Sequence, residues 1–515
     1  MKKVILIFLF HILLLLLTNL NYAQIVYNSN WSTVGGNSNR TGYDENFYGG
    51  FIAFERTFSA PNSLWGMPVF TYHQYFATTR YTSLNPLRAL IVGYSFQGGS
   101  TDPVWTYGAN SGVNIIMGMN NDKVYVRDFQ QNGSDTIFAL NASNGSLLWK
   151  SRFTVERGII WTAVFTDNGD LVLPGSGAKR IMRINHTNGD TVWTNSRIIP
   201  NTGAETMCIN GNTLYAWEGG LTTPKKIIAI DVNTGIKKYS SADLPGDGDQ
   251  EIPFTVSKNG VVYCIRDGGL MYALKDTGTG FDILWSRSVM QPVGTYTQFA
   301  VGKDNSVYIP FGKKIYRLNH LNGEALDSSI DLVSSGDINP RFAMGIFEEL
   351  YVGNGASVPS EGKFFAFSSN LQNLIGEISF PYNYYSGPSL GSEFTYPHIL
   401  FTGAGTEIKT RYHIIDNIVS LNTGIPSTFE LKQNYPNPFN PSTNLEFGIS
   451  ELGFVSLKIY DAAGKEVATL VNEILSPGKY NYQFSIFNYQ LSSGIYFYTL
   501  KSGEFTETKR MILLK

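Results

Sequence analysis

A turn motif that recurs about every 45 residues constrains the fold of this chain more than any other feature. In each copy an apolar strand ends at Asn or Asp, a glycine follows four residues later, and an aromatic residue follows after four more. The clearest copies are TIFALNASNGSLLW (136–149), RIMRINHTNGDTVW (180–193) and KIIAIDVNTGIKKY (226–239), and weaker ones occupy 314–327 and 269–285. A period of this length, built from short strands, is typical of the four-stranded blades of a β-propeller.

The residue types of the motif suit a tight hairpin turn. Asn or Asp opens the turn, and glycine takes the left-handed conformation that closes it. The aromatic residue then lies on the outgoing strand, where a large ring can dock between one blade and the next and bury roughly 150–250 Å². The predicted docking residues are Trp105, Trp149, Trp193, Tyr239 and Trp285, which are separated by 44, 44, 46 and 46 residues.

The number of blades follows from the outer strands. These strands mark seven blades, the last at LIGEISF (374–380). Residues 387–415 supply about three more strands, and the early strand FIAFERTFSA (51–60) can complete that set. We therefore predict an all-β chain with an eight-bladed propeller over 24–415, and seven blades are the alternative.

The first 23 residues read as a signal peptide. Lys2 and Lys3 precede an apolar run from Val4 to Leu17, and Ala23 is a plausible cleavage position. The run is short for a membrane span, although an uncleaved anchor is the alternative. The mature chain is therefore expected to be exported. The net charge is −2 and no basic stretch occurs, so nucleic acid is not an expected partner.

A second domain follows a change of composition near Asp416. Residues 416–427 form a polar linker, and 428–515 contain six or seven alternating strands, typical of a small Ig-like β-sandwich. This domain opens with NYPNPFNPST (434–443), in which three prolines exclude a helix or a central strand.

Both parts resemble known families. The repeat resembles the quinoprotein-like (PQQ-type) propeller repeat, and WSTVGGNSNRTGY (31–43) resembles the opening of many secreted members. Residues 428–515 resemble the type A C-terminal sorting domain of the type IX secretion system of Gram-negative bacteria. That resemblance is carried by Asn434, Tyr435, Pro436, Asn437, Pro438, Gly494, Tyr496 and Lys515. It implies passage through the periplasm and delivery by the type IX secretion machinery to the outer cell surface or the medium. It also implies removal of the domain between 421 and 428, followed by attachment to lipopolysaccharide or release.

The sequence argues against the chemistry of the quinoprotein dehydrogenases. Those enzymes carry a vicinal disulfide beside the quinone, whereas Cys208 and Cys264 are 56 residues apart and are predicted to be buried free thiols. No cofactor is therefore expected, and a PQQ-dependent dehydrogenase is disfavoured.

Two candidate metal sites remain. Asp247, Asp249 and Glu251 alternate in the loop LPGDGDQEI (244–252) and could hold Ca²⁺, although a solvated polar loop is the alternative. His73, His398 and His413 lie in blades expected to meet where the propeller closes; three unrelated histidines are the alternative. Carboxylates in the hairpins, such as Asp170, are interpreted as turn-formers, and His186 and His320 as exposed hairpin residues.

No catalytic group emerges, so the interpretation is a non-catalytic propeller that binds protein or glycan. Tyrosine-rich loops at 380–387 and 292–299 are candidates for that contact. The alternative is a secreted polysaccharide-active hydrolase or lyase that uses the propeller funnel.

Overall fold

The computed structural model separates into two compact units, Tyr27–His413 and Ile414–Lys515. The structure describes residues 32, 36–37, 40–44, 47, 54–65, 67–97, 100–108, 112–129, 135–155, 163–174, 180–196, 207–220, 223–246, 255–266, 269–288, 299–336, 338–345, 348–380, 382–393, 396–412, 418–421, 426–440, 442–451, 453–475, 477–485 and 491–514. These residues are all-β apart from one short 3₁₀ helix, η1 (Pro359–Glu361). None of the described helical structure is both long and apolar enough to span a bilayer. The predicted signal peptide lies outside the described residues.

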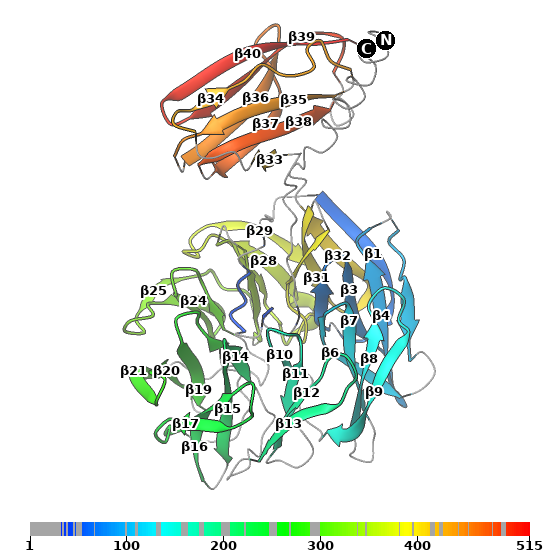
Figure 1. Ribbon diagram of the computed structural model, residues 1–515, viewed down its shortest axis with the longest axis vertical. Helices are drawn as coiled ribbons and strands as arrows, with labels where there is room; N and C mark the ends of the chain where they lie inside the picture. The colour runs from blue at the N-terminus through cyan, green and yellow to red at the C-terminus, as the bar shows by residue number, and fades with distance from the viewer. Residues whose placement is uncertain are drawn as a thin grey trace, which may run out of the picture. The chain divides into compact units, whose positions relative to one another are not determined.

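Four-stranded antiparallel ladders of consecutive strands make up most of the larger unit (Figure 1). Two of them, joined by a single parallel pair between Ala89 and Val113, form one eight-stranded sheet. The first ladder contains β2 (Val69–Tyr72), β3 (Tyr75–Leu84), β4 (Leu87–Ser95) and β5 (Trp105–Tyr107). The second contains β6 (Val113–Asn120), β7 (Lys123–Phe129), β8 (Asp135–Asn141) and β9 (Leu147–Val155).

Five further sheets repeat the same order along the chain. They are β10 (Val164–Phe165), β11 (Leu171–Pro174), β12 (Arg180–Ile184) and β13 (Thr191–Ser196); β14 (Cys208–Asn210), β15 (Thr213–Gly220), β16 (Thr223–Asp231) and β17 (Lys237–Ser240); β18 (Thr255–Val256), β19 (Val261–Arg266), β20 (Leu270–Asp276) and β21 (Phe281–Ser288); β22 (Ala300–Val301), β23 (Val307–Phe311), β24 (Lys314–Leu318) and β25 (Ala325–Ser328); and β26 (Arg341–Met344), β27 (Leu350–Gly353), β28 (Lys363–Phe367) and β29 (Leu374–Ser379).

The last sheet of the larger unit combines both ends of its chain. It contains β30 (Ser389–Glu393), β31 (Tyr396–Thr402) and β32 (Gly405–Tyr412), and β1 (Phe54–Ser63) pairs with β32 along its outer edge. The prediction that the early strand at 51–60 completes the last set is therefore confirmed.

Apolar clusters lie between successive sheets of the larger unit. One cluster joins each ladder to the next along the chain, from β2–β5 through to β30–β32. A further cluster packs Phe58, Leu400 and Ile408 of the last sheet against Phe76 and Tyr94 of the first. The core is therefore divided among the sheet-to-sheet interfaces, and packing connects the last sheet back to the first.

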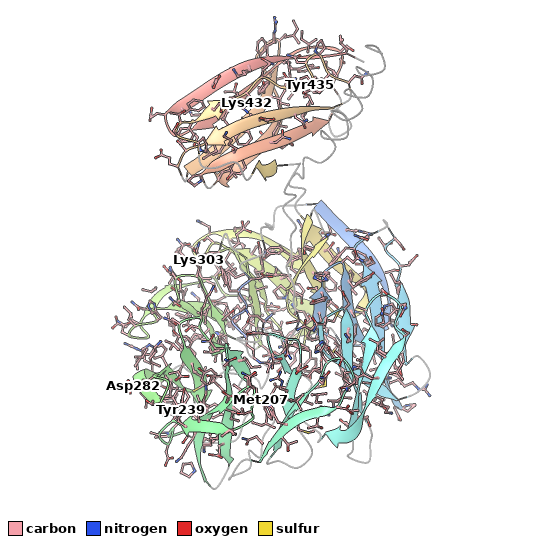
Figure 2. All side chains as sticks on the ribbon, in the orientation of Figure 1. Met207, Tyr239, Asp282, Lys303, Lys432 and Tyr435 are labelled. Carbon is pink, nitrogen blue, oxygen red and sulfur yellow. The ribbon has the colours of Figure 1, made fainter. Side chains whose placement is uncertain are left out.

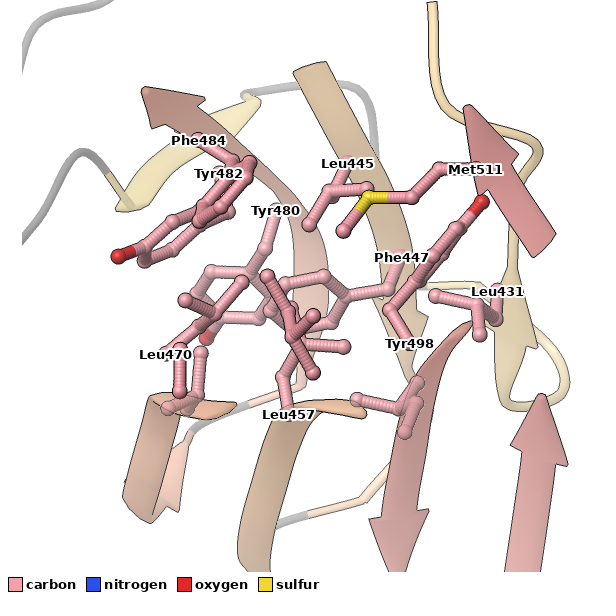
Figure 3. Packing of buried hydrophobic residues seen from close by; sticks show 14 of the residues in the cluster. Leu431, Leu445, Phe447, Leu457, Leu470, Tyr480, Tyr482, Phe484, Tyr498 and Met511 are labelled. Carbon is pink, nitrogen blue, oxygen red and sulfur yellow. The ribbon is translucent and has the colours of Figure 1, made fainter. Parts of the chain in front are cut away.

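The smaller unit consists of two four-stranded sheets that share one apolar core (Figure 3). One sheet has the order β33 (Ile418–Leu421), β38 (Gly478–Ser485), β35 (Ser442–Ile449) and β34 (Glu430–Leu431). The other has the order β37 (Glu466–Leu475), β36 (Gly453–Asp461), β39 (Gly494–Ser502) and β40 (Phe505–Leu513). Six or seven strands were expected in this domain, and eight are described. The additional strands are β34, which has only two residues, and β33, which falls within the predicted linker.

Candidate functional site

The described residues between Ser32 and Phe47 contact the first strands of several sheets in the larger unit. Their carbonyl groups accept hydrogen bonds of 2.7–2.9 Å from four different sheets. The pairs are Met119 of β6 with Ser32, Thr255 of β18 with Arg40, Val301 of β22 with Thr41, and Met344 of β26 with Gly42. Figure 1 shows this segment in dark blue among β10, β14 and β28. First strands of propeller blades surround the central channel, so this segment lies where the predicted funnel would be.

Arg40 is the most deeply placed charge of this segment, with 4% of its surface exposed. Its Nε donates to the carbonyl oxygen of Met207 at 2.6 Å, and a terminal nitrogen donates to that of Ala163 at 3.5 Å. These two residues immediately precede β14 and β10. Burial lowers the pKa of Arg40 to about 10, which leaves the guanidinium protonated at neutral pH. One residue therefore links three sheets, since its own carbonyl also accepts from Thr255 of β18.

The predicted turns of the repeat are confirmed. In the first copy, the side-chain oxygen of Asn141 accepts from the amide of Ser143 at 2.8 Å, and the amide of Gly145 donates to the Asn141 carbonyl at 2.9 Å. Gly145 has a φ of 70°, in the left-handed region that glycine favours. The turns at Asn185, Asp231 and Asn319 repeat both hydrogen bonds.

Each predicted docking tryptophan contacts the turn of the following four-stranded ladder. The indole Nε1 donates to a carbonyl oxygen in that turn, from Trp105 to Ala142, Trp149 to His186, Trp193 to Val232 and Trp285 to His320, at 2.8–3.0 Å. The ring also covers the turn glycine: a Cβ added at Gly145, Gly189, Gly235 or Gly323 would lie only 2.5–2.7 Å from an indole carbon. The glycine is thus required by the neighbouring ring as well as by the turn, a reason that the spacing of the motif did not reveal.

Tyr239 makes a different contact at its interface. Its hydroxyl donates to Oδ1 of Asp276 at 2.6 Å, and the hydroxyl of Tyr215 donates to Oδ2 at 2.5 Å. Asp276 opens the turn with two extra residues, and its Oδ1 also accepts from the amide of Gly278 at 2.7 Å. Burial, together with the hydrogen bond to this carboxylate, raises the pKa of both tyrosines. At this interface, hydrogen bonds from two tyrosine hydroxyls to the Asp276 carboxylate replace the contact between an indole ring and a turn glycine.

Asp170 is more than a turn-former, because it is a buried carboxylate that contacts a guanidinium and an imidazole. Arg183 approaches its Oδ2 at 2.9 Å, and Nδ1 of His186 lies 2.9 Å from its Oδ1. His186 is consequently half-buried and not the exposed hairpin residue that was expected. Arg183 also donates to the Val232 carbonyl of the next sheet at 3.0 Å, so this network too spans an interface.

The predicted metal ligands are not brought together among the residues that the structure describes. Asp247, Asp249, Glu251 and His413 lie outside those residues. His73 is exposed beside Asp122, whereas His398 is buried with its ring stacked on Phe96 at 4.3 Å. No group of three or more His, Cys, Asp or Glu within the described ranges could hold a metal ion.

The two cysteines are buried free thiols, as predicted. Cys208 lies on β14 and Cys264 on β19, within one apolar cluster between their sheets. Burial raises the pKa of both thiols, so neither is poised to act as a thiolate.

One tyrosine-rich loop is described and the other is not. Residues 291–298 lie outside the described part of the chain. In the loop after β29, the rings of Tyr384 and Tyr385 are 5.0 Å apart, and Tyr385 lies 6.0 Å from Trp65. All three rings are half-buried, so each keeps part of its surface accessible.

The sorting motif forms an irregular segment beside β40 in the smaller unit. Asn434 is buried: its amide donates to the Tyr498 hydroxyl at 2.7 Å, and its Nδ2 donates to Oγ1 of Thr443 at 2.9 Å. Asn437 accepts from the amide of Ile512 at 2.9 Å. Gly494 and Tyr496 lie on β39, the strand that pairs with β40. Gly494 pairs with Leu513, and the hydroxyl of Tyr496 donates to the Ser492 carbonyl at 2.8 Å. Lys515 lies outside the described residues.

Two family models match the sequence. Residues 92–309 match a repeat model described as outer membrane protein assembly factor BamB, which is built of PQQ-type repeats, and residues 433–514 match the secretion system C-terminal sorting domain. The chain therefore carries PQQ-type repeats and a type IX sorting domain. No curated protein matches the sequence.

Solved structures of similar fold include two dehydrogenases. A europium-containing methanol dehydrogenase has a TM-score of 0.53 and 13% identity, covering 73% of this propeller chain and 90% of its own. The quinohemoprotein alcohol dehydrogenase ADHIIG of Pseudomonas putida HK5 has a TM-score of 0.54 and 13% identity, covering 80% and 83%. BamB of Moraxella catarrhalis has a TM-score of 0.45 and 14% identity, covering 70% and 98%. At these identities the likeness to the two dehydrogenases concerns the fold alone.

Proposed function

We propose that the larger unit is an eight-bladed propeller that acts as an exported, non-catalytic module for binding protein or glycan. The blade number is supported by the eight four-stranded ladders of the described residues, counting the two within the eight-stranded sheet. It is also supported by the apolar cluster between the last sheet and the first, which is the packing that ring closure requires.

The observation that carries the non-catalytic proposal is the course of the N-terminal segment. Its carbonyl groups already accept hydrogen bonds from the first strands of four sheets, and Arg40 fills the space beside two more. A substrate entering along the axis would have to displace these bonds and uncover a buried guanidinium. Desolvated hydrogen-bonded charges are costly to unpair, so this channel is a poor place for a substrate.

The residues present do not fit a pyrroloquinoline quinone. Cys208 and Cys264 stand on different sheets, so they cannot form the vicinal disulfide that the resemblance implies beside that cofactor. Described residues of the N-terminal segment also bind the first strands that would surround the cofactor. We therefore derive no redox step for this protein.

Binding is better supported at the aromatic loop after β29. Tyr384, Tyr385 and Trp65 present half-buried rings in edge-to-face contact, which combine an apolar face with polar tips. Such rings contact protein and sugar surfaces at low entropic cost because few torsions need to be fixed. We place the ligand-binding surface at this aromatic cluster.

Export is the better supported half of the function. The type IX sorting domain indicates delivery to the cell surface or the medium and implies interaction with the type IX secretion machinery. We propose that residues 1–23 are a signal peptide, that the chain crosses the periplasm of a Gram-negative bacterium, and that an Ig-like domain over 428–515 is removed at 421–428. Attachment to lipopolysaccharide or release would follow, and calcium at Asp247, Asp249 and Glu251 stays a prediction.

The binding proposal is tested on the secreted protein with a glycan array, a pull-down of surface proteins and a polysaccharide-degradation screen. We expect binding without release of reducing ends. Tyr385→Ala should weaken binding at least tenfold, whereas Leu84→Ala, an exposed apolar control on β3, should leave it unchanged. Turnover of any polysaccharide would overturn the proposal in favour of the hydrolase or lyase alternative.

A further inference from the structure

The segment Asn434–Phe439 has a buried anchor residue at each end and exposed side chains between them. Asn434 and Phe439 are buried, whereas the four residues between them are exposed. Tyr435 is the extreme case, because 79% of its surface is exposed, more than that of any other exposed large hydrophobic residue described (Figure 2). An aromatic ring so exposed adds little to the stability of the domain that carries it.

The first anchor holds the backbone on the N-terminal side of the ring. Asn434 donates through Nδ2 to Thr443 at 2.9 Å and to the carbonyl of Pro436 at 3.1 Å, which Thr443 also binds at 2.8 Å. The amide and carbonyl of Tyr435 itself exchange two hydrogen bonds with Asn444, at 3.0 and 2.9 Å. None of these bonds involves the Tyr435 ring.

The second anchor fixes the other side to β40. The side chain of Asn437 accepts from the amide of Ile512 and donates to the carbonyl of Arg510 at 3.2 Å. The backbone of Phe439 pairs with Ile512 at 2.9 Å and with Leu514 at 3.1 Å, and its ring packs edge-on against Phe484 in the core. The backbone between the anchors is therefore held in one conformation, and Pro436 and Pro438 restrict its torsions further.

We propose that Tyr435, flanked by Pro436 and Pro438, is the contact through which the type IX secretion machinery recognises this domain. The inference rests on the proposed export of the chain by that machinery. A ring displayed on a fixed backbone loses little conformational entropy on binding, and tyrosine is enriched among the residues that dominate interface energies. The partner that fits is a protein with an apolar pocket that accepts the protruding Tyr435 ring.

The domain supplies a matched control for this surface. Phe454 on β36 is also a strongly exposed aromatic residue, with 55% of its surface accessible, but it lies on a regular strand between Gly453 and Val455. If export required only exposed apolar surface, replacing either ring would have the same effect. If Tyr435 is the recognition residue, replacing it should reduce export, whereas replacing Phe454 should not.

The test expresses the full chain in a bacterium with a working type IX system and measures the fraction outside the cells against the fraction retained. Tyr435→Ala should reduce the exported fraction at least tenfold, and Phe454→Ala and Tyr435→Phe should leave it within twofold of wild type. Calorimetry of the purified full chains should show that Tyr435→Ala leaves the thermal midpoint of the domain within about one degree. Wild-type export of Tyr435→Ala, or a large loss of midpoint, overturns the inference.

A deletion of 428–515 separates this inference from the proposed function. If the deleted chain is still exported, delivery through the sorting domain is wrong, whatever Tyr435 does. If the deletion abolishes export and Tyr435→Ala does not, only the assignment of Tyr435 is wrong.

Discussion

Replacing Gly189 by alanine should destabilise the propeller far more than the same substitution at Gly312. Both glycines close hairpins with positive φ, 77° and 59°, so both substitutions force alanine into the left-handed region. They differ in what the new Cβ meets. At Gly189 it would lie 2.5 Å from Cε3 of Trp149, whereas at Gly312 no heavy atom lies within 4 Å.

The size of the difference follows from the buried indole. Left-handed strain costs both variants about 1 kcal/mol. Trp149 is 8% exposed, and complete loss of about 200 Å² of burial would cost about 5 kcal/mol. Displacing half of the ring costs about 2.5 kcal/mol, and the lost bond to the His186 carbonyl adds about 1 kcal/mol. We therefore expect about 4–5 kcal/mol at Gly189 and about 1 kcal/mol at Gly312.

Urea unfolding followed by tryptophan fluorescence measures this difference in the full chain. All eight tryptophans lie between positions 31 and 285, so the signal reports on the larger unit and not on the sorting domain. A double-mutant cycle then identifies the cause: in a Trp149→Ala background, Gly189→Ala should cost only the strain of about 1 kcal/mol. Equal losses at the two glycines, or additive effects in the cycle, would refute the docking argument.

Three further substitutions test the contacts between sheets. Burial alone would raise the pKa of Asp170, but hydrogen bonds from His186 and Arg183 hold that pKa below the ordinary 3.8. The ionised carboxylate therefore stabilises the fold above pH 3.8, and this stabilisation is lost as the pH falls through the lowered pKa. Asp170→Asn should accordingly flatten the decline of the thermal midpoint below about pH 4. Arg40→Met should lower the unfolding free energy by about 2 kcal/mol in urea titrations, since buried carbonyl oxygens lose their donor, whereas a change below 0.5 kcal/mol would show that Arg40 does not hold the segment. Tyr239→Phe and Asp276→Asn should be non-additive in the same assay, because the hydroxyl of Tyr239 binds that carboxylate.

Local features of the fold could be predicted from the sequence, because their causes lie within a few residues. The turns at Asn141 and Asn185 follow from side chains that bind backbone two residues on and from glycines that tolerate positive φ. The pairing of β1 with β32 could also be predicted. The end of the unit supplied only three strands, one fewer than the four of each repeat, and the early strand was available to complete the set.

Contacts between sheets could not be predicted from the same patterns. The motif places Trp149 on its strand, but the partner of its indole is a carbonyl 37 residues away in the next turn. The turn carboxylate Asp170 likewise finds Arg183 and His186 only after β11 and β12 pair. These partners depend on the register and twist of neighbouring strands, which no short window of sequence specifies.

The sorting motif shows the same division. Its prolines predict an irregular segment, but they do not say which side chains face outward. In an extended chain, neighbouring side chains point to opposite sides, so Asn434 turns inward to Thr443 while Tyr435 turns outward. The inward-facing residue makes a contact far along the chain, since the backbone amide of Asn434 donates to the hydroxyl of Tyr498, 64 positions away.

The repeat itself limits where a ligand can be sought. Leu148, Val192 and Leu284 are all exposed and each directly precedes a docking tryptophan. Because side chains alternate along a strand, a ring directed into the interface forces its neighbour outward, so this recurring apolar exposure follows from docking and needs no ligand. A binding surface should instead lie where the period is broken. The loop after β29 is such a place, since its accessible rings belong to no copy of the motif.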